Sequence, residues 1–190
     1  MINAEFNNVN TLEEFYSEIV RQQTESHGEH YCGHHNAIRK YIKNCNSYME
    51  LGTHQGATAA CAMLCKPERI TLVDISMKKF NSFLRPLAEE YCDKNDIHLG
   101  IKECDSTSLG SINNTDILLI DSLHHPAHMK KELDLHGGNV NNYIIAHDTS
   151  ILHGKPNEAL FNVLYDFSIS NNWKILDRET RNVGYTVLGK

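Results

Sequence analysis

Acidic residues and histidines follow two apolar segments of the chain at the point where each segment ends. Asp121 closes one apolar run, and His124 follows three residues later. His147 and Asp148 close the next apolar run. Short runs that are apolar on both faces are typical of buried parallel strands. Because the carboxyl ends of neighbouring parallel strands meet at one edge of a sheet, we expect these side chains to converge there.

This group of side chains could perform two kinds of chemistry. Histidine has an unperturbed pKa of about 6.5, so His124 and His147 are candidates for taking a proton from a hydroxyl group, with Asp148 beside them. Two carboxylates with an imidazole could instead bind Mg²⁺ or Mn²⁺, and less readily Zn²⁺. A structural role is the alternative: residues 147–149 would then fix the next loop by hydrogen bonds, and His124 would cap a helix.

A turn bracketed by two glycines follows the first apolar segment. It reads Glu50-Leu51-Gly52-Thr53-His54-Gln55-Gly56. Gly52 allows a sharp turn and the close approach of a ligand, and Gly56 allows close packing at the start of a helix with free amides. The spacing differs from the G-x-G-x-x-G of dinucleotide-binding proteins, and the lysine of a phosphate-binding loop is absent. A tight turn without a ligand explains the two glycines equally well.

Two further acids follow the next two apolar segments. Asp74 ends the segment 69–74, where a carboxylate can accept hydrogen bonds from both hydroxyls of a ribose. Asp105 lies just past the segment 98–104, where it could bind the amino group of an adenine. Together with the glycine turn, these positions describe a slot for adenosine. For Asp74 the alternative is a surface acid or a helix cap.

The order of the elements predicts the fold. Strands are expected at 47–51, 69–74, 98–104, 116–121 and 143–148, with helices at 57–65, 77–94, 127–135 and 157–170. Buried strands linked by right-handed crossovers form a doubly wound sheet. The last two strands, 173–177 and 185–188, are joined by a link too short for a helix and must be antiparallel. We therefore predict an α/β protein with a Rossmann-like, mostly parallel sheet that ends in an antiparallel hairpin.

The residues before the first strand are expected to form a small helical cap over the carboxyl edge of the sheet. Thr11, followed three residues later by Glu14, is typical of a helix start. Helices are expected at 15–23 and 36–42. The predicted division is a cap at residues 1–45 and a Rossmann-like domain at residues 46–190. The histidine-rich segment 27–35 matches no zinc-binding spacing, and we interpret it as a lid or a loop facing the substrate.

Composition limits the class of partner. The chain has 190 residues, 41% of them hydrophobic, and its 18 basic and 24 acidic side chains give a formal net charge of −6. We therefore expect a small-molecule substrate and no nucleic acid partner. No apolar run reaches the roughly 18 residues that span a bilayer, and the amino-terminal segment lacks the pattern of a secretion signal. A cytoplasmic protein without a membrane partner is expected, and a homo-oligomer is an open alternative because the cap is small.

These features together resemble the class I S-adenosylmethionine-dependent methyltransferases, over roughly residues 46–190. The resemblance rests on the Glu50-x-Gly52-x-x-x-Gly56 turn, the acid ending the second strand, the acid after the third strand and the terminal hairpin. It implies a seven-stranded sheet whose last strand is inserted antiparallel, with S-adenosylmethionine as ligand. The cofactor-binding residues that it implies are Glu50, Gly52 and Gly56 around the methionine portion, Asp74 at the ribose, Asp105 at the adenine and Asp121 beside the methyl donor.

The segments after the fourth and fifth strands narrow this resemblance. D-x-L-H and H-D-T, with E-L-x-x-H between them, are similar to a poorly characterised viral and bacterial branch of the superfamily. That branch is related to the metal-assisted small-molecule O-methyltransferases and to the cephalosporin-hydroxylase-like group. In the metal-dependent relatives, acids after the fourth and fifth strands hold a divalent ion. Asp121 and Asp148 match those positions.

The sequence therefore favours a methyltransferase acting on a small molecule, with a hydroxyl as the expected acceptor and a divalent metal as an option. Amino-group and carboxylate acceptors stay open. The fourth strand ends in Asp121-Ser122-Leu123-His124 and lacks the Asn/Asp-Pro-Pro-aromatic motif of enzymes that methylate amino groups. This argues against nucleic-acid bases as acceptors. Two alternatives stay open. One is a catalytically inactive regulatory module that binds adenosine or S-adenosylmethionine, and the other is a nicotinamide-dependent oxidoreductase, which the absent G-x-G-x-x-G disfavours.

Overall fold

A seven-stranded sheet forms the centre of the computed structural model, which describes residues 4–152 and 155–190. The strands are β1 (Ser47–Leu51), β2 (Arg69–Asp74), β3 (His98–Glu103), β4 (Thr115–Ile120), β5 (Val140–His147), β8 (Lys174–Glu179) and β9 (Tyr185–Gly189). Their order is β3-β2-β1-β4-β5-β9-β8. The first five are parallel to one another, and β9 lies antiparallel between β5 and β8. The predicted mostly parallel sheet with a terminal antiparallel hairpin is confirmed.

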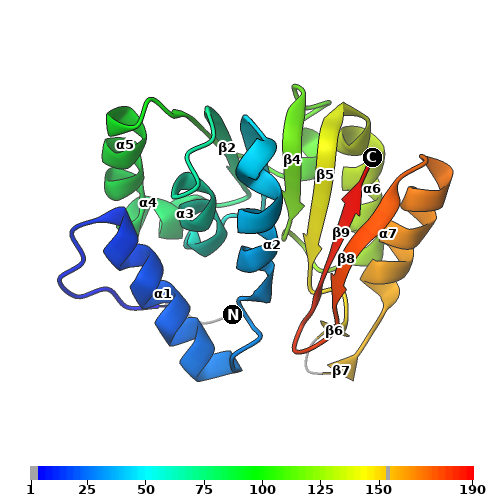
Figure 1. Cartoon of the computed structure of the whole chain (residues 1–190), viewed down its shortest axis with the longest axis horizontal. Coiled ribbons are helices and arrows are strands. Elements are labelled where there is room, and N and C mark those ends of the chain that lie inside the picture. Colours follow the sequence, from blue (N-terminus) through cyan, green and yellow to red (C-terminus); the bar gives the residue numbers. More distant parts are fainter. Residues whose placement is uncertain (1–3, 153–154) are drawn as a thin grey trace.

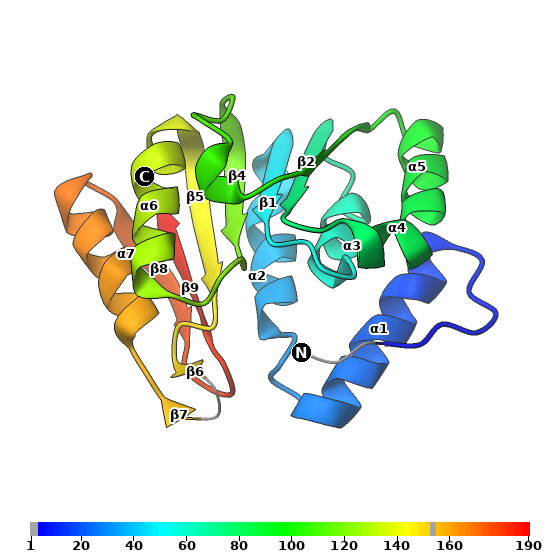
Figure 2. The ribbon, with the colours of Figure 1, turned by 180° about the vertical axis from the view of Figure 1, so that it is seen from behind.

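Helices cover both faces of this sheet (Figures 1 and 2). The first face carries α1 (Leu12–His27), α2 (Gly33–Tyr41), α3 (Ala57–Met63), α4 (Lys78–Phe83) and α5 (Arg85–Lys94), and the second carries α6 (Pro126–His136) and α7 (Ala159–Ser170). Successive residues of a strand point to opposite faces, so Ile145 packs in the core of the first face and Ile144 in that of the second. In the described part of the chain, no helix combines the length and apolar character that crossing a membrane would require.

The amino-terminal helices share the core of the first face. Phe15 of α1 and Ile38 of α2 are fully buried in the same cluster as Leu72 of β2. The boundary at residue 45 stays a prediction. The observed α1 extends past the expected 15–23 and ends at His27, where Gly28 adopts a φ of +93° and donates its N–H to the carbonyl of Thr24.

Three further segments differ from the sequence-based expectation. The helix expected over 77–94 is two helices, α4 and α5, because Pro86 lies in the first turn of α5 and has no N–H to continue the helix before it. The second helix begins earlier than expected, at Gly33, with a short 3₁₀ helix, η1 (Ile42–Asn44), after it. The loop after β5 contains a small additional sheet of β6 (Ile151–Leu152) and β7 (Lys155–Pro156).

Two 3₁₀ helices complete the connections on the second face. They are η2 (Ser106–Ser108) and η3 (Gly137–Asn139). Residues 104–114, all of them described, contain only η2 as a helix between β3 and β4. This connection therefore adds no long helix to the second face of the sheet.

The turn after β1 passes very close to the turn after β4. Gly52 has a φ of +95°, and a Cβ atom placed on it would lie 2.1 Å from the carbonyl oxygen of Asp121. Backbone hydrogen bonds of 2.8 Å join the N–H of Gly52 to the carbonyl of Val73 and the N–H of Asp121 to the carbonyl of Leu51. The ends of β1, β2 and β4 are thus tied together at a position where only glycine fits.

Replacing Gly52 by alanine should lower the free energy of unfolding by about 2 kcal/mol or more, because both the left-handed backbone and the contact with Asp121 oppose a side chain. Gly110→Ala is the matched control. Gly110 also has a positive φ, +71°, but nothing lies within 4 Å of an added Cβ. Gly110→Ala should lower the free energy of unfolding by only about 1 kcal/mol, the cost of placing alanine in a left-handed conformation. Urea unfolding measures both losses, and equal losses would contradict the role of the close contact.

Candidate functional site

Two carboxylates and two imidazoles meet where β4 and β5 end. The Oδ1 atom of Asp121 lies 3.1 Å from Nδ1 of His147 and 3.3 Å from Nε2 of His124. Nδ1 of His124 lies 2.8 Å from Oδ2 of Asp148, so the His124 ring bridges the two carboxylates. Asp148 has a φ of +56°, a left-handed conformation that an aspartate tolerates. The structure therefore brings together the four residues that the sequence placed at this edge.

Burial and mutual charge set the protonation of this cluster. Burial lowers the pKa of His124, but hydrogen bonds to Asp121 and Asp148 and their charges outweigh it and raise the pKa to about 10. Burial raises the pKa of Asp121, yet the charge of His147 and the bonds to both histidines hold it well below its usual range. In this state His124 is an imidazolium with no lone pair to accept a proton. Its predicted role as a base therefore requires that it first lose that proton.

Glu50 lies at the base of the glycine turn and is fully buried. The hydroxyl of Tyr48 donates to its Oε2 atom at 2.6 Å, and the nearby side chains of Thr58 and Thr53 also favour its ionised form. Its Oε1 atom makes no hydrogen bond of ordinary geometry. Burial raises the pKa of Glu50 to about 7. A buried carboxylate with an unpartnered oxygen is costly unless a cation or a donor completes it. Glu50 itself lines neither of the two cavities beside the turn.

Asp74 ties the glycine turn to the end of β2. Its Oδ2 atom accepts hydrogen bonds from the backbone N–H groups of Thr53 and His54, at 2.8 and 2.7 Å. Its Oδ1 atom accepts from the N–H of Ser76 at 2.9 Å. A carboxylate offers about four acceptor positions, so roughly one remains for a ligand. Asp74 thus has the expected position, and it has in addition a structural role in holding the turn.

Gly56, the second glycine of the turn, is needed for packing. Its φ is +90°, and an added Cβ would lie 2.3 Å from Cδ2 of Leu84. This close contact sets α3 against the segment between α4 and α5. Gly56 also lines the smaller of the two cavities beside the turn.

The larger cavity, of about 350 Å³, lies at the carboxyl edge of β1, β2 and β3. Four of the predicted cofactor residues line it: Gly52, Asp74, Asp105 and Asp121. Asp105 caps η2 by accepting a hydrogen bond from the N–H of Thr107. Ile75 and Leu123 also line this cavity, although 75% and 61% of their surfaces are exposed. Large exposed apolar side chains at a cavity indicate a binding surface for a ligand with an apolar face.

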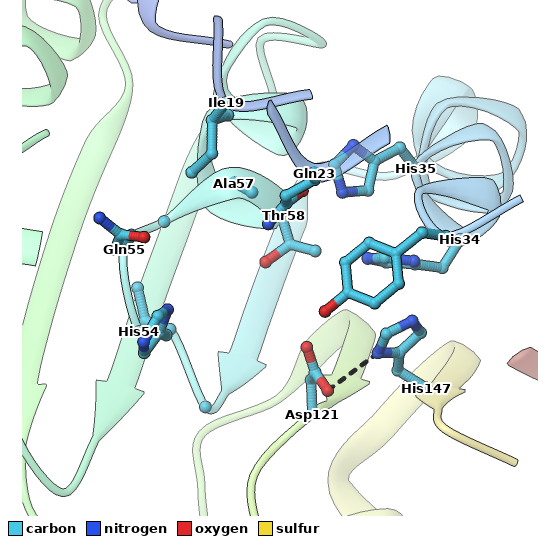
Figure 3. Close-up of a pocket in the computed structure, with 14 residues that line it drawn as sticks. Ile19, Gln23, His34, His35, His54, Gln55, Ala57, Thr58, Asp121 and His147 are labelled. Carbon is cyan, nitrogen blue, oxygen red and sulfur yellow. Dashed lines mark hydrogen bonds and ion pairs between the residues drawn. The ribbon is translucent and has the colours of Figure 1, made fainter. Parts of the chain in front are cut away.

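The smaller cavity, of about 40 Å³, lies beneath α1 and α2 (Figure 3). Gly52, His54 and Asp121 line both cavities. Figure 3 shows the Asp121 carboxylate joined to His147, with His34 beside the His147 ring. The ring centroids of His34 and His147 are 3.9 Å apart.

The histidines of α2 are the site residues that sequence reasoning missed. The segment 27–35 stood out by its composition, but α2 begins at Gly33 and so buries His34 and His35 in its first turn. Nε2 of His35 and Nε2 of His147 are buried without a hydrogen-bond partner. Tyr31, from the same segment, lines the smaller cavity, whereas His30 lies near Arg181, with 3.3 Å between their nitrogens, and outside both cavities. The amphipathic pattern of residues 33–41 was the sequence signal that could have predicted this helix and the burial of its histidines.

Comparison with known proteins supports the fold. No protein-family model matches the chain, and no curated protein matches its sequence. Among solved structures, a putative caffeoyl-CoA O-methyltransferase from Staphylococcus aureus is 11% identical, with a TM-score of 0.67 over 96% of this chain and 93% of that chain. The magnesium protoporphyrin IX methyltransferase of Synechocystis PCC 6803, with bound SAM, is 12% identical, with a TM-score of 0.59 over 98% and 86%.

The 16S rRNA methylase RmtB is a further structural neighbour, 10% identical, with a TM-score of 0.60 over 94% of this chain and 68% of that chain. These neighbours are class I S-adenosylmethionine-dependent methyltransferases. The chain therefore has the Rossmann-like methyltransferase fold, and the resemblance that the sequence indicated is confirmed at the level of the fold.

The buried carboxyl of Glu50 predicts a pH-dependent stability difference. Its pKa is about 7 in the folded chain, above the ordinary value of 4.5, so the folded state binds more protons between these values than the unfolded state. This group therefore makes the wild type less stable as pH rises from about 4.5 to 7. Urea unfolding should show Glu50→Gln gaining stability relative to the wild type over this range. The exposed Glu90→Gln is the control for losing one carboxylate, and a pH-independent difference for Glu50→Gln would contradict the prediction.

Proposed function

We propose that the chain is an S-adenosylmethionine-dependent methyltransferase that methylates a hydroxyl group of a small molecule. The observation that carries this proposal is the 350 Å³ cavity beside the glycine turn, which shares Asp121 with the cluster of carboxylates and imidazoles. The fold supports it, because structural neighbours were solved with SAM and with SAH bound. Neighbours include methylases of small molecules and of rRNA, and the net charge of −6 favours a small acceptor.

The residues of the larger cavity would hold the adenosine portion of the cofactor. Ile75 and Leu123 would cover the two faces of the adenine, and the carboxylate of Asp105 would accept from its amino group. The remaining acceptor position of Asp74 would take a ribose hydroxyl. Beyond Gly52, the free Oε1 atom of Glu50 would attract the ammonium group of the methionine portion, which restores the charge balance of this buried carboxylate.

Asp121, His124 and Asp148 would hold a divalent cation. One ligand atom of each residue lies within 4.8 Å of the others, so the donor set fits an ion. Two carboxylate oxygens and an imidazole nitrogen suit Mn²⁺, and Mg²⁺ with more water ligands. When bound, such an ion lowers the pKa of a coordinated hydroxyl. His124 must give up its proton to become a ligand, so we expect loading to release protons and to strengthen with pH.

Methyl transfer from a sulfonium is an in-line displacement. The bond from the methyl carbon to sulfur breaks as the bond to the acceptor oxygen forms, the sulfur leaves as a neutral thioether, and the hydroxyl proton passes to a base. His147 is positioned for this part of the reaction, because Asp121 fixes its Nδ1 atom and leaves its Nε2 atom without a partner. The orientation of the acceptor would therefore depend on His147 and on His34 beside it.

S-adenosylhomocysteine should stabilise the protein, and NAD and ATP should not. At 100 times its dissociation constant, a ligand adds about 2.7 kcal/mol to the free energy of unfolding, which a thermal shift detects. Leu123→Ser should weaken this binding about tenfold, because one apolar face of the adenine loses its cover. Ile169→Ser is the matched control, an exposed apolar side chain on α7 outside the cavity. Stronger stabilisation by NAD than by S-adenosylhomocysteine would contradict the proposal.

Asp148→Asn should abolish methyl transfer and weaken Mn²⁺ binding at least tenfold. The affinity for S-adenosylhomocysteine should stay within about threefold of the wild type, because Asp148 does not line the larger cavity. Calorimetry with Mn²⁺ and with S-adenosylhomocysteine measures the two affinities separately. The exposed Asp166→Asn serves as the control. Unchanged Mn²⁺ affinity in Asp148→Asn would remove the metal from the proposal, and retained activity would make the cluster structural.

A further inference from the structure

One helix beneath the larger cavity carries three polar side chains at a spacing of four residues. His128, Glu132 and His136 lie one turn apart on α6 and therefore share one face of the helix. Glu132 and His136 are 0% exposed. A carboxylate is rarely buried in full unless hydrogen bonds or charges compensate it. The partners of Glu132 therefore indicate why it is there.

A single oxygen of Glu132 holds two separate loops. Its Oε1 atom accepts a hydrogen bond from the hydroxyl of Ser106 at 2.5 Å and from the hydroxyl of Ser122 at 2.6 Å. Ser106 begins η2 after β3, and Ser122 lies in the turn after β4. Both serines line the larger cavity. Glu132 thus fastens two different walls of one cavity to the same atom.

The other two polar residues of α6 strengthen the hold on η2. Nε2 of His136 lies 2.9 Å from the carbonyl oxygen of Ser106. Nε2 of His128 lies 3.2 Å from the Ser106 hydroxyl and 3.3 Å from Oε1 of Glu132. Ser106 is therefore held at both its side chain and its backbone. Because residues 104–114 contain only η2 as a helix, these bonds from α6 supply the support that a longer packed helix would otherwise give.

We propose that Glu132 is a positioning residue for the cofactor, which sets the spacing of the two walls that enclose the adenine. This inference rests on the proposed function. Each serine bonded to Glu132 is the sequence neighbour of a residue proposed to touch the adenine: Asp105 precedes Ser106, and Leu123 follows Ser122. Holding the serines therefore fixes the acceptor of the adenine amino group and the apolar cover of its ring at one distance from each other.

Substitution of Glu132 tests this inference through ligand discrimination. Glu132→Leu should weaken S-adenosylhomocysteine binding about tenfold or more and should reduce the preference over S-inosylhomocysteine, in which an oxygen replaces the amino group. Glu132→Gln keeps an acceptor oxygen and should restore both values to within about threefold of the wild type. Asp134→Asn is the control, because Asp134 is an exposed acid of the same helix. Calorimetry measures each affinity.

The ratio of the two affinities separates positioning from general destabilisation. A loosened fold weakens both ligands alike and leaves their ratio unchanged, so an unchanged ratio in Glu132→Leu would overturn the inference. Should Glu132→Leu fail to fold, the double variant Ser106→Ala and Ser122→Ala removes the same two hydrogen bonds and should reduce the ratio in the same way.

Hydrogen exchange without any ligand distinguishes this inference from the proposed function. The amides of residues 105–108 and 122–124 should exchange faster in Glu132→Leu than in the wild type, and Asp134→Asn should leave them unchanged. If the wild type binds no S-adenosylhomocysteine, the proposed function fails, and faster exchange in both loops still supports the role of Glu132 in holding the walls. Unchanged exchange in either loop would overturn it.

Discussion

The turns after β1 and β4 meet backbone to backbone at Gly52 and Asp121, and the rest of the site is arranged around this contact. Because no side chain separates the two turns, the Asp121 carboxylate reaches both cavities and also bonds to His124 and His147. Asp74 supports the contact from β2 by accepting two backbone hydrogen bonds from the glycine turn. A ligand that lies along the carboxyl edge of the sheet, from β3 toward β5, would therefore contact the backbone of these turns and the carboxylates beside them.

Negative charge is concentrated along this path, and the chain compensates it in two different ways. Asp121 and Asp148 are paired with imidazoles, whereas Glu50 has a tyrosine hydroxyl and one unpartnered oxygen. The charge of His147 and the bonds to both histidines hold the pKa of Asp121 well below its usual range, whereas the pKa of Glu50 is raised to about 7 because its burial is only partly compensated. A ligand with a positive charge near Glu50 would remove this imbalance, which is the property expected of the methionine portion of the proposed cofactor.

The sequence predicted the sheet well because β-type apolar runs, glycine turns and strand-ending acids are local signals. The convergence of Asp121, His124 and Asp148 followed from parallel topology alone. The contributions of α2 and α6 could not be predicted in this way. His34 is buried because α2 starts at Gly33, and no side-chain cap marks that start, since Cys32 before it makes no capping hydrogen bond. Glu132 resembles any helix acid, and its two serine partners lie 26 and 10 residues away, so that only tertiary packing reveals them.

The bridging position of His124 has a consequence for how folding relates to the binding of an ion. Protonated His124 lies between Asp121 and Asp148, and His147 also lies beside Asp121, so both carboxylates have partners of their own at the edge of the sheet. Two buried carboxylates without such partners would repel each other and oppose folding. With them, the fold can form without an ion, and the divalent cation proposed for this site would bind in exchange for protons.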